Sequence, residues 1–248
     1  MKIGILADIH GNWEALSAVL EHASAEGVDR FVCLGDVVGY NANPHECVEK
    51  IRSLDCLSIV KGNHDYYAAN DEFMLGFNPQ AFLAVKWTRE NLTAEDRKWL
   101  EDLPMTGDVL LSEPPVHFSL VHGTLDNPPD WGYVLNDFYA GESMKQQWTQ
   151  LCFFGHTHVP AVYEQTMTEL RGAFQDKIQL EDGCKYLVNV GSVGQPRDRD
   201  PRAAYGIYDV EQNLIVLHRV KYDIATAQEK IRAACLPGRC ADRLEFGV

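Results

Sequence analysis

Short apolar runs alternate with amphipathic helical patterns at the start of the chain. The runs at residues 2–7, 31–34 and 57–60 have the length of buried strands, and residues 13–26 and 44–54 between them have helical periodicity. Consecutive strands joined by helices return in the same direction, because each crossover carries the chain back to its starting edge. The pattern therefore predicts an α/β fold with a parallel sheet and right-handed crossovers.

The first helix has both a start signal and a stop signal. Asn12 is a predicted N-cap, and Gly27 follows the last periodic residue. The predicted apolar stripe of this helix consists of Trp13, Leu16, Leu20 and Ala23. This face is expected to pack on the sheet.

The remainder of the chain predicts more helices and a second group of strands. Asn78-Pro79 opens one helix, and Thr93 with Asp96 forms a capping box for the next. A hairpin is expected around Gln212-Asn213. The predicted strands are at residues 117–121, 151–154, 161–166, 186–190, 204–208 and 214–220, and a last helix is at 224–235. With no repeat or linker, we expect a single domain over residues 1–248 with two packed sheets.

Composition excludes several classes of protein. The formal charge of −14 argues against long nucleic acid as a partner, although a local cationic centre can still attract a small phosphorylated substrate. No apolar run approaches the roughly 18 residues that span a membrane, and the N-terminus turns polar too soon for a signal peptide. The seven cysteines include no Cys-x-x-Cys pair. We expect a cytoplasmic protein with reduced cysteines, and no feature specifies its oligomeric state.

Five short polar motifs each follow a predicted strand. They contain five of the nine histidines in the chain. Each motif alone also fits an ordinary turn, but strand ends of an α/β sheet converge on one crevice, where ligands bind. The motifs are Asp8-Ile9-His10, Gly35-Asp36, Gly62-Asn63-His64-Asp65, His122-Gly123 and Gly155-His156-Thr157-His158.

These residue types suit a pair of divalent cations. Two ions held about 3.5–4 Å apart repel each other, so a carboxylate shared between them is expected, and Asp36 is a natural bridge. Asp8 and His10 lie two residues apart at one strand end and can hold one ion together. Nitrogen and oxygen ligands suit Mn, Fe, Zn or Ni. Two such ions would attract phosphate and lower the pKa of bound water.

The ordered motifs resemble those of the calcineurin-like metallophosphoesterase superfamily, and the resemblance spans Asp8 to His158. It implies a four-layer α-β-β-α sandwich of two mixed sheets flanked by helices. It also implies that Asp36 bridges the two ions, and that His64 protonates the leaving oxygen with Asp65 as its orienting partner. The implied ligands of one ion are Asp8, His10 and His158, and those of the other are Asn63, His122 and His156.

Departures from neighbouring families narrow the expected activity. Protein phosphatases of this superfamily usually place an arginine soon after Gly-Asn-His, where this chain has Tyr66, Tyr67, Ala68 and Ala69. Purple acid phosphatases place a tyrosine ligand where this chain has Gly39, with Tyr40 one residue later. The chain is most similar to the small prokaryotic phosphodiesterase-like branch. We expect hydrolysis of a small phosphodiester or nucleotide by in-line attack of metal-bound hydroxide. The alternatives are a phosphomonoesterase or protein phosphatase, and a non-catalytic protein-binding scaffold.

Two loops are further candidates for contacts with substrate. Residues 189–198 follow a predicted strand, and Arg197 and Arg202 are candidates to bind phosphate, with Tyr40 from the loop after Asp36. The glycines of this loop also fit a tight turn. Residues 127–133 include Trp131 and Tyr133, which predict either a cleft wall that stacks on a ring or an aromatic loop packed on the core.

Overall fold

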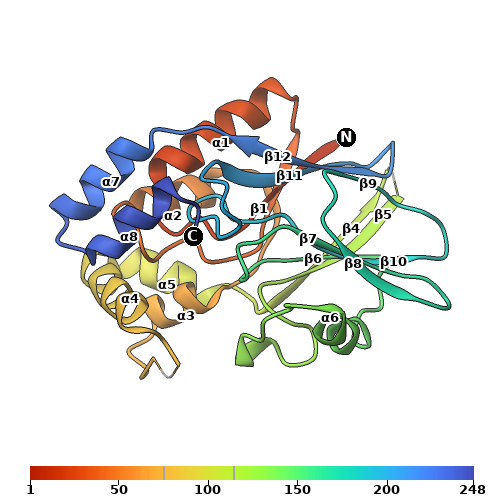
Figure 1. The fold of residues 1–248 in the computed structure, drawn as a ribbon, viewed down its shortest axis with the longest axis horizontal. Coiled ribbons are helices and arrows are strands. Elements are labelled where there is room, and N and C mark those ends of the chain that lie inside the picture. Colours follow the sequence, from red (N-terminus) through yellow and green to blue (C-terminus); the bar gives the residue numbers. More distant parts are fainter. Residues whose placement is uncertain (75, 114) are drawn as a thin grey trace.

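The computed structural model describes residues 1–74, 76–113 and 115–248, and these residues form two mixed six-stranded sheets (Figure 1). In spatial order, the first sheet contains β3 (Cys56–Ile59), β2 (Arg30–Cys33), β1 (Lys2–Leu6), β11 (Ala203–Asp209), β12 (Leu214–Val220) and β9 (Lys177–Gln179). The second contains β4 (Thr106–Ser112), β5 (Pro115–Val121), β6 (Leu151–Phe154), β10 (Lys185–Asn189), β7 (Ala161–Gln165) and β8 (Leu170–Ala173).

Both sheets are mixed: the parallel strands form one side of the first sheet and the centre of the second. Strands β1, β2 and β3 are parallel to one another, and β5, β6 and β10 form a parallel group in the second sheet. Strands β11 and β12 form the expected hairpin and pair antiparallel. The predicted parallel arrangement of the first three strands is confirmed.

Helices cover the outer faces of the two sheets. On the first sheet, α1 (Trp13–Ala25) packs against β11 and β12, and α2 (Pro44–Ser53) packs beside α1. On the second, α6 (Asp137–Met144) packs against β8. The other helices are α3 (Asn63–Ala69), α4 (Pro79–Asn91), α5 (Ala94–Asp102), α7 (Ile224–Ala233) and α8 (Gly238–Asp242). The predicted four-layer α-β-β-α sandwich is confirmed.

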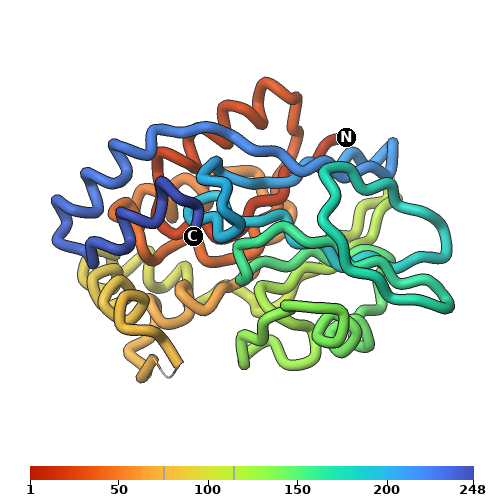
Figure 2. Tube along the Cα trace, in the orientation of Figure 1, coloured from red at the N-terminus to blue at the C-terminus, as the bar shows by residue number. Residues whose placement is uncertain are grey.

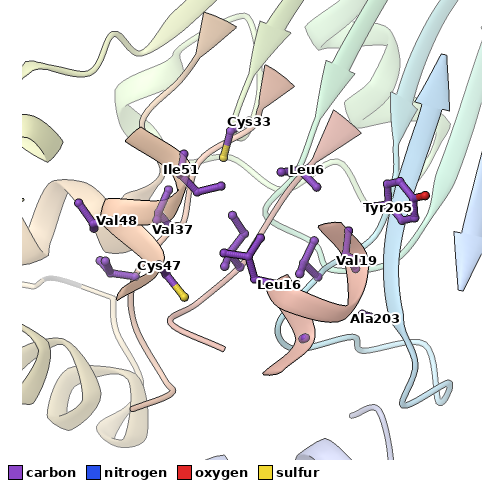
Figure 3. Packing of buried hydrophobic residues seen from close by; sticks show 14 of the residues in the cluster. Leu6, Leu16, Val19, Cys33, Val37, Cys47, Val48, Ile51, Ala203 and Tyr205 are labelled. Carbon is purple, nitrogen blue, oxygen red and sulfur yellow. The ribbon is translucent and has the colours of Figure 1, made fainter. Parts of the chain in front are cut away.

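Alternating side chains of β1 hold the layers together. Ile3 and Ile5 are fully buried between the two sheets, while Leu6 points to the opposite face, under α1 and α2. Figure 3 shows Leu6 with Leu16 of α1 and Tyr205 of β11 in this outer cluster. Burying each such side chain stabilises the fold by about 1.5–3 kcal/mol.

Several elements were not predicted from the sequence. They are α3, α6, α8, β4, β8 and β9. Strand β8 has only one partly buried residue, so it lacks the apolar alternation that identifies a strand. Among the described residues, no helix is long and apolar enough to cross a membrane.

The C-terminal helices return to the first half of the chain. Figure 2 shows the blue C-terminal segment, ahead of the terminus itself, beside the yellow segment that contains α4. Ala81 and Ala84 of α4, Ile231 of α7, and Cys240 of α8 share one buried cluster with Tyr40. This contact brings α8 next to the loop that follows β2.

Candidate metal centre

The structure brings all the predicted metal ligands together at the carboxyl ends of strands from both sheets. Ligand atoms of Asp8, His10, Asp36 and His158 lie within 4.8 Å of one another, and so do those of Asp36, His122 and His156. The side-chain oxygen of Asn63 lies 3.2 Å from His122 Nε2. Asp36 belongs to both groups, which is the arrangement expected of a shared carboxylate.

The backbone at this cluster is strained. Ten non-glycine residues in the described chain have φ between 50° and 69°, the left-handed region that side chains disfavour. Half of them are candidate ligands, and such strain is typical of functional sites because the surrounding structure must hold it in place. These five are Asp8, His10, Asp36, His156 and His158.

Glycine in two of the motifs gives the carboxylates room. A Cβ atom at Gly62 would lie 2.1 Å from Asp36 Oδ1, and one at Gly155 would lie 2.9 Å from Asp8 Oδ2. A methyl group at Gly62 would therefore displace the shared carboxylate.

His10 and His158 are held in a form that suits a cation. Nδ1 of His10 donates to the carbonyl of Val38 at 3.0 Å, and Nδ1 of His158 donates to the carbonyl of Gln195 at 2.6 Å. In the neutral rings, both Nε2 atoms then carry lone pairs, and they face each other at 3.0 Å. Burial lowers the pKa of both rings well below the usual value, so a proton does not readily relieve this repulsion. A metal ion would.

His122 offers a second position for positive charge. Nδ1 donates to the carbonyl of Leu34 at 2.8 Å, which leaves Nε2 facing Asn63 Oδ1 at 3.2 Å and Asp36 Oδ2 at 3.4 Å. Burial disfavours the imidazolium, but the charge of Asp36 and its hydrogen bond outweigh burial and raise the pKa of His122 to about 9. Nε2 of His156 is buried without a hydrogen-bond partner among the described residues. These donors fit a divalent cation in place of the proton.

The two carboxylates differ in their titration. Burial, with a smaller contribution from Asp36, raises the pKa of Asp8 to about 7. Burial also opposes ionisation of Asp36, but the charges of His122 and His64 outweigh it and hold the pKa of Asp36 below its usual value. Asp36 is therefore the carboxylate that stays charged even without a bound ion.

His64 lies at the site without joining either ligand group. Its main-chain N–H donates to Asp36 Oδ1 at 2.8 Å, and its ring lines the hollow above the cluster. Burial lowers the pKa of its ring to about 4. Nδ1 has no hydrogen-bond partner among the described residues.

The expectation that Asp65 orients His64 is wrong. Asp65 Oδ1 accepts the main-chain N–H of Val38, and Oδ2 accepts that of Gly62. Both oxygens therefore face main-chain donors of neighbouring loops. Asp65 holds the Asp36 loop against the start of α3 and does not fix the His64 ring.

The loop at residues 191–197 supports the cluster, a role that sequence reasoning did not assign to its polar residues. Besides the Gln195 carbonyl that fixes His158, Ser192 Oγ donates to the carbonyl of Asp8 at 2.7 Å. Asn189, at the end of β10, donates to the carbonyl of Gly155 at 2.7 Å. The run of polar residues from the end of β10 onwards was the sequence signal that could have indicated this supporting role.

A hollow of about 220 Å³ opens above the cluster. Tyr40, Trp131 and Tyr133 line it with Arg197, so part of the loop at residues 127–133 lies in the wall of the hollow, whereas its stacking on a bound ring stays a prediction. The ring of Tyr133 lies 3.9 Å from that of His156, between centroids.

Arg202 is not at the site, contrary to expectation. It does not line this hollow, and its guanidinium forms an ion pair with Asp200 at the surface. The Asp200 carboxylate neutralises the guanidinium charge of Arg202 that was expected to bind phosphate.

The fold and the cluster define a class of protein, an α/β sandwich with buried aspartates and histidines that could hold metal at converging strand ends. A family model described as the calcineurin-like phosphoesterase superfamily domain matches residues 1–213. The chain therefore belongs to the calcineurin-like phosphoesterase superfamily.

Relatives match over nearly the full length. An uncharacterised protein of Methanocaldococcus jannaschii is 41% identical over 245 residues, which cover 99% of this chain and 98% of the relative. A metallophosphoesterase from Sphaerobacter thermophilus is 37% identical with a TM-score of 0.85, covering 100% of this chain and 99% of that one. A hypothetical protein from Pyrococcus horikoshii OT3 shares the fold, with a TM-score of 0.79 at 22% identity, over 100% of this chain and 98% of that one.

Proposed function

We propose that this protein is a binuclear metal-dependent phosphodiesterase that hydrolyses a small phosphodiester or nucleotide. The observation that carries the proposal is the pair of ligand groups that share Asp36. Asp8, His10 and His158 would hold one ion, and Asn63, His122 and His156 the other. When bound, two divalent ions activate water and offset the negative charge that builds up on the phosphoryl group.

His64 is proposed to protonate the leaving oxygen. Its ring lines the hollow with Asp36 and Asn63, and no described side chain forms a hydrogen bond with its Nδ1. A bound phosphate would favour the protonated ring, because a nearby negative charge opposes the lowering of its pKa by burial. General acid catalysis of this kind contributes about 10²–10⁴-fold to a rate.

The aromatic residues that line the hollow support a small substrate with a planar ring. The volume of the hollow suits a small ester, and the partly buried residues Tyr67, Phe77 and Trp131 line the hollow. Aromatic walls favour stacking with a nucleobase or other ring. The complete set of ligands argues against a non-catalytic scaffold. A phosphomonoesterase or protein phosphatase is the competing activity.

Hydrolysis of bis-p-nitrophenyl phosphate with added Mn²⁺ tests the proposal. We expect turnover that stops after chelation and returns with metal, and faster turnover of this diester than of p-nitrophenyl phosphate. His156→Gln should abolish turnover, whereas His117→Gln, which replaces a histidine on β5 outside the cluster, should retain it. No metal-dependent turnover, together with no bound metal by elemental analysis, would overturn the proposal. A preference for the monoester would reject the phosphodiesterase assignment alone.

A further inference from the structure

A second hollow, of about 300 Å³, lies beside the candidate metal centre. Its wall includes three arginines, Arg197 from the loop after β10, and Arg239 and Arg243 from the C-terminal helices. Tyr40 and Arg197 line both hollows, so the two spaces adjoin at these side chains. A molecule bound at the metal centre can therefore extend past Arg197 towards the other two arginines.

In the described part of the chain, the three guanidinium groups have no acidic side chain as a partner. Among the described residues, none of them forms an ion pair with an Asp or Glu side chain, although the chain has 36 acidic and 22 basic residues. Arginines elsewhere on the surface do form such pairs, as Arg232 does with Asp242. In a chain with a net charge of −14, three arginines that surround one hollow and have no Asp or Glu ion pair among the described residues favour a bound anion.

Arg197 is the best placed of the three to bind an anion. Its Nη2 donates to two neutral groups, Gln195 Oε1 at 3.0 Å and the Tyr40 hydroxyl at 3.4 Å. Its Nε is buried without a hydrogen-bond partner in the described part of the chain. A buried, unsatisfied donor on a cation is costly, and an anion would satisfy it.

Arg243 is half-buried and close to Arg197. Its Nε donates to the main-chain oxygen of Val248, which leaves the terminal nitrogens of its guanidinium group for another partner. Burial lowers the pKa of Arg243, and the like charge of Arg197 lowers it further. Mutual repulsion between the arginines would be relieved by a shared anion. Arg239 is exposed at the rim of the same hollow.

We propose that this hollow is a subsite for a second phosphate group, so that the substrate is a small phosphate ester with a second phosphate. This inference rests on the proposed function for the position of the first phosphate. Guanidinium groups bind phosphate through paired, charge-assisted hydrogen bonds, and three of them match a dianionic group better than a single carboxylate. Arg197 lies between the two phosphates and contacts the molecule at both positions.

Competition between two nucleotides tests the subsite. Adenosine 5′-monophosphate and adenosine 3′,5′-bisphosphate are compared as inhibitors of bis-p-nitrophenyl phosphate hydrolysis by the metal-loaded enzyme. The bisphosphate should inhibit at least about tenfold more strongly, because the added charge-assisted hydrogen bonds favour it. In Arg239→Gln/Arg243→Gln, the ratio of the two inhibition constants should fall towards one. The matched control, Arg171→Gln/Arg232→Gln, removes the same charge from exposed arginines and should keep the ratio of the parent.

A direct binding measurement separates this inference from the proposed function. Calorimetric titration of the purified protein with adenosine 3′,5′-bisphosphate should show binding that weakens with salt and weakens further in Arg239→Gln/Arg243→Gln. Arg239→Gln alone should also bind the bisphosphate more weakly than the parent. Because this substitution changes an exposed side chain, the fold should be retained, and the weaker binding would report on the subsite. Two results would overturn the subsite even if diester hydrolysis is confirmed. One is equal binding of adenosine 5′-monophosphate and adenosine 3′,5′-bisphosphate by the parent, and the other is an unchanged ratio of their affinities in the double variant. If hydrolysis fails, the titration still decides the subsite.

Discussion

His64 and Asn63 are adjacent in the chain, yet their side chains meet different surroundings. The Asn63 oxygen points at His122, within the ligand cluster. The His64 ring instead packs 4.5 Å from the ring of Tyr40, between centroids, and belongs to neither ligand group. This separation supports a role for His64 towards the substrate.

We therefore expect His64→Ala to keep its metal and lose most of its turnover. The loss should be about 10²–10⁴-fold for esters with poor leaving groups and smaller for p-nitrophenolate, which departs without a proton. The test measures steady-state hydrolysis rates of a series of esters with different leaving groups, and elemental analysis of the same preparation gives its metal content. Loss of metal, or an equal loss of rate for all leaving groups, would contradict the assignment.

Gly62 tests the space around the shared carboxylate. In Gly62→Ala, the added methyl would lie 2.1 Å from Asp36 Oδ1, so we expect weaker metal binding and a loss of about 1–3 kcal/mol in the free energy of unfolding. Gly238→Ala is the control, because a Cβ at that position meets nothing within 4 Å. Metal titration and urea denaturation of both variants give the comparison. Equal behaviour of the two variants would show that the site tolerates the displacement.

The sequence predicted which side chains would gather but not how they are held. Asp8, Asp36 and the other predicted ligands meet because strand ends converge, and the sequence shows that each motif follows a predicted strand. The contact of His158 with the Gln195 carbonyl joins residues 37 positions apart, so no local pattern predicts it. The same holds for Asp65, whose partner Val38 lies on the neighbouring loop.

At the scale of elements, α5 supports the helix that begins at the site. Helix α3, which contains Asn63 and His64, packs against α5. Thr93 and Asp96 cap α5 reciprocally, as predicted, and the buried Asp96 carboxylate also binds Nδ1 of His45 at 2.7 Å. One side chain thus joins α2 to α5.

Asp96→Ala should destabilise the fold by about 1–3 kcal/mol, because it removes the cap and leaves the His45 ring without its partner. Asp102→Ala, at an exposed position paired with Lys98, should change the free energy of unfolding by less than about 0.5 kcal/mol. Urea denaturation of the two variants measures both values. A similar effect of the two substitutions would show that the cap contributes little.

Elements with long periodic patterns were predicted, and short or polar ones were not. Helix α1 begins at Trp13 after the Asn12 cap, as expected, because its cap and its apolar stripe are local features. Helix α3 begins within the polar motif at Asn63 and has seven residues, so its stability comes from packing on α4 and α5. Strand β4 was missed because most of its side chains are exposed or partly exposed.

At the scale of the whole molecule, the ligand cluster joins the two sheets. Asp8 and Asp36 follow strands of the first sheet, and His122 and His156 follow strands of the second. An ion bound by ligands from both sheets would link them in the folded state and not in the unfolded chain.

Chelation should therefore lower the thermal midpoint. An ion present at 100 times its dissociation constant stabilises the fold by about 2.7 kcal/mol, so its removal should lower the midpoint by about 5–10 °C. Scanning calorimetry with chelator, and after Mn²⁺ is restored, measures the change. An unchanged midpoint would mean that no bound ion links the sheets.

Metal stoichiometry in Asp36→Asn tests the shared carboxylate most directly. Asparagine keeps the size of the side chain but removes its charge, and both ligand groups include Asp36. Elemental analysis after exhaustive dialysis should find two ions per chain in the parent and loss of both in the variant, with His117→Gln retaining two. Two ions still bound to Asp36→Asn would contradict a binuclear centre built around this residue.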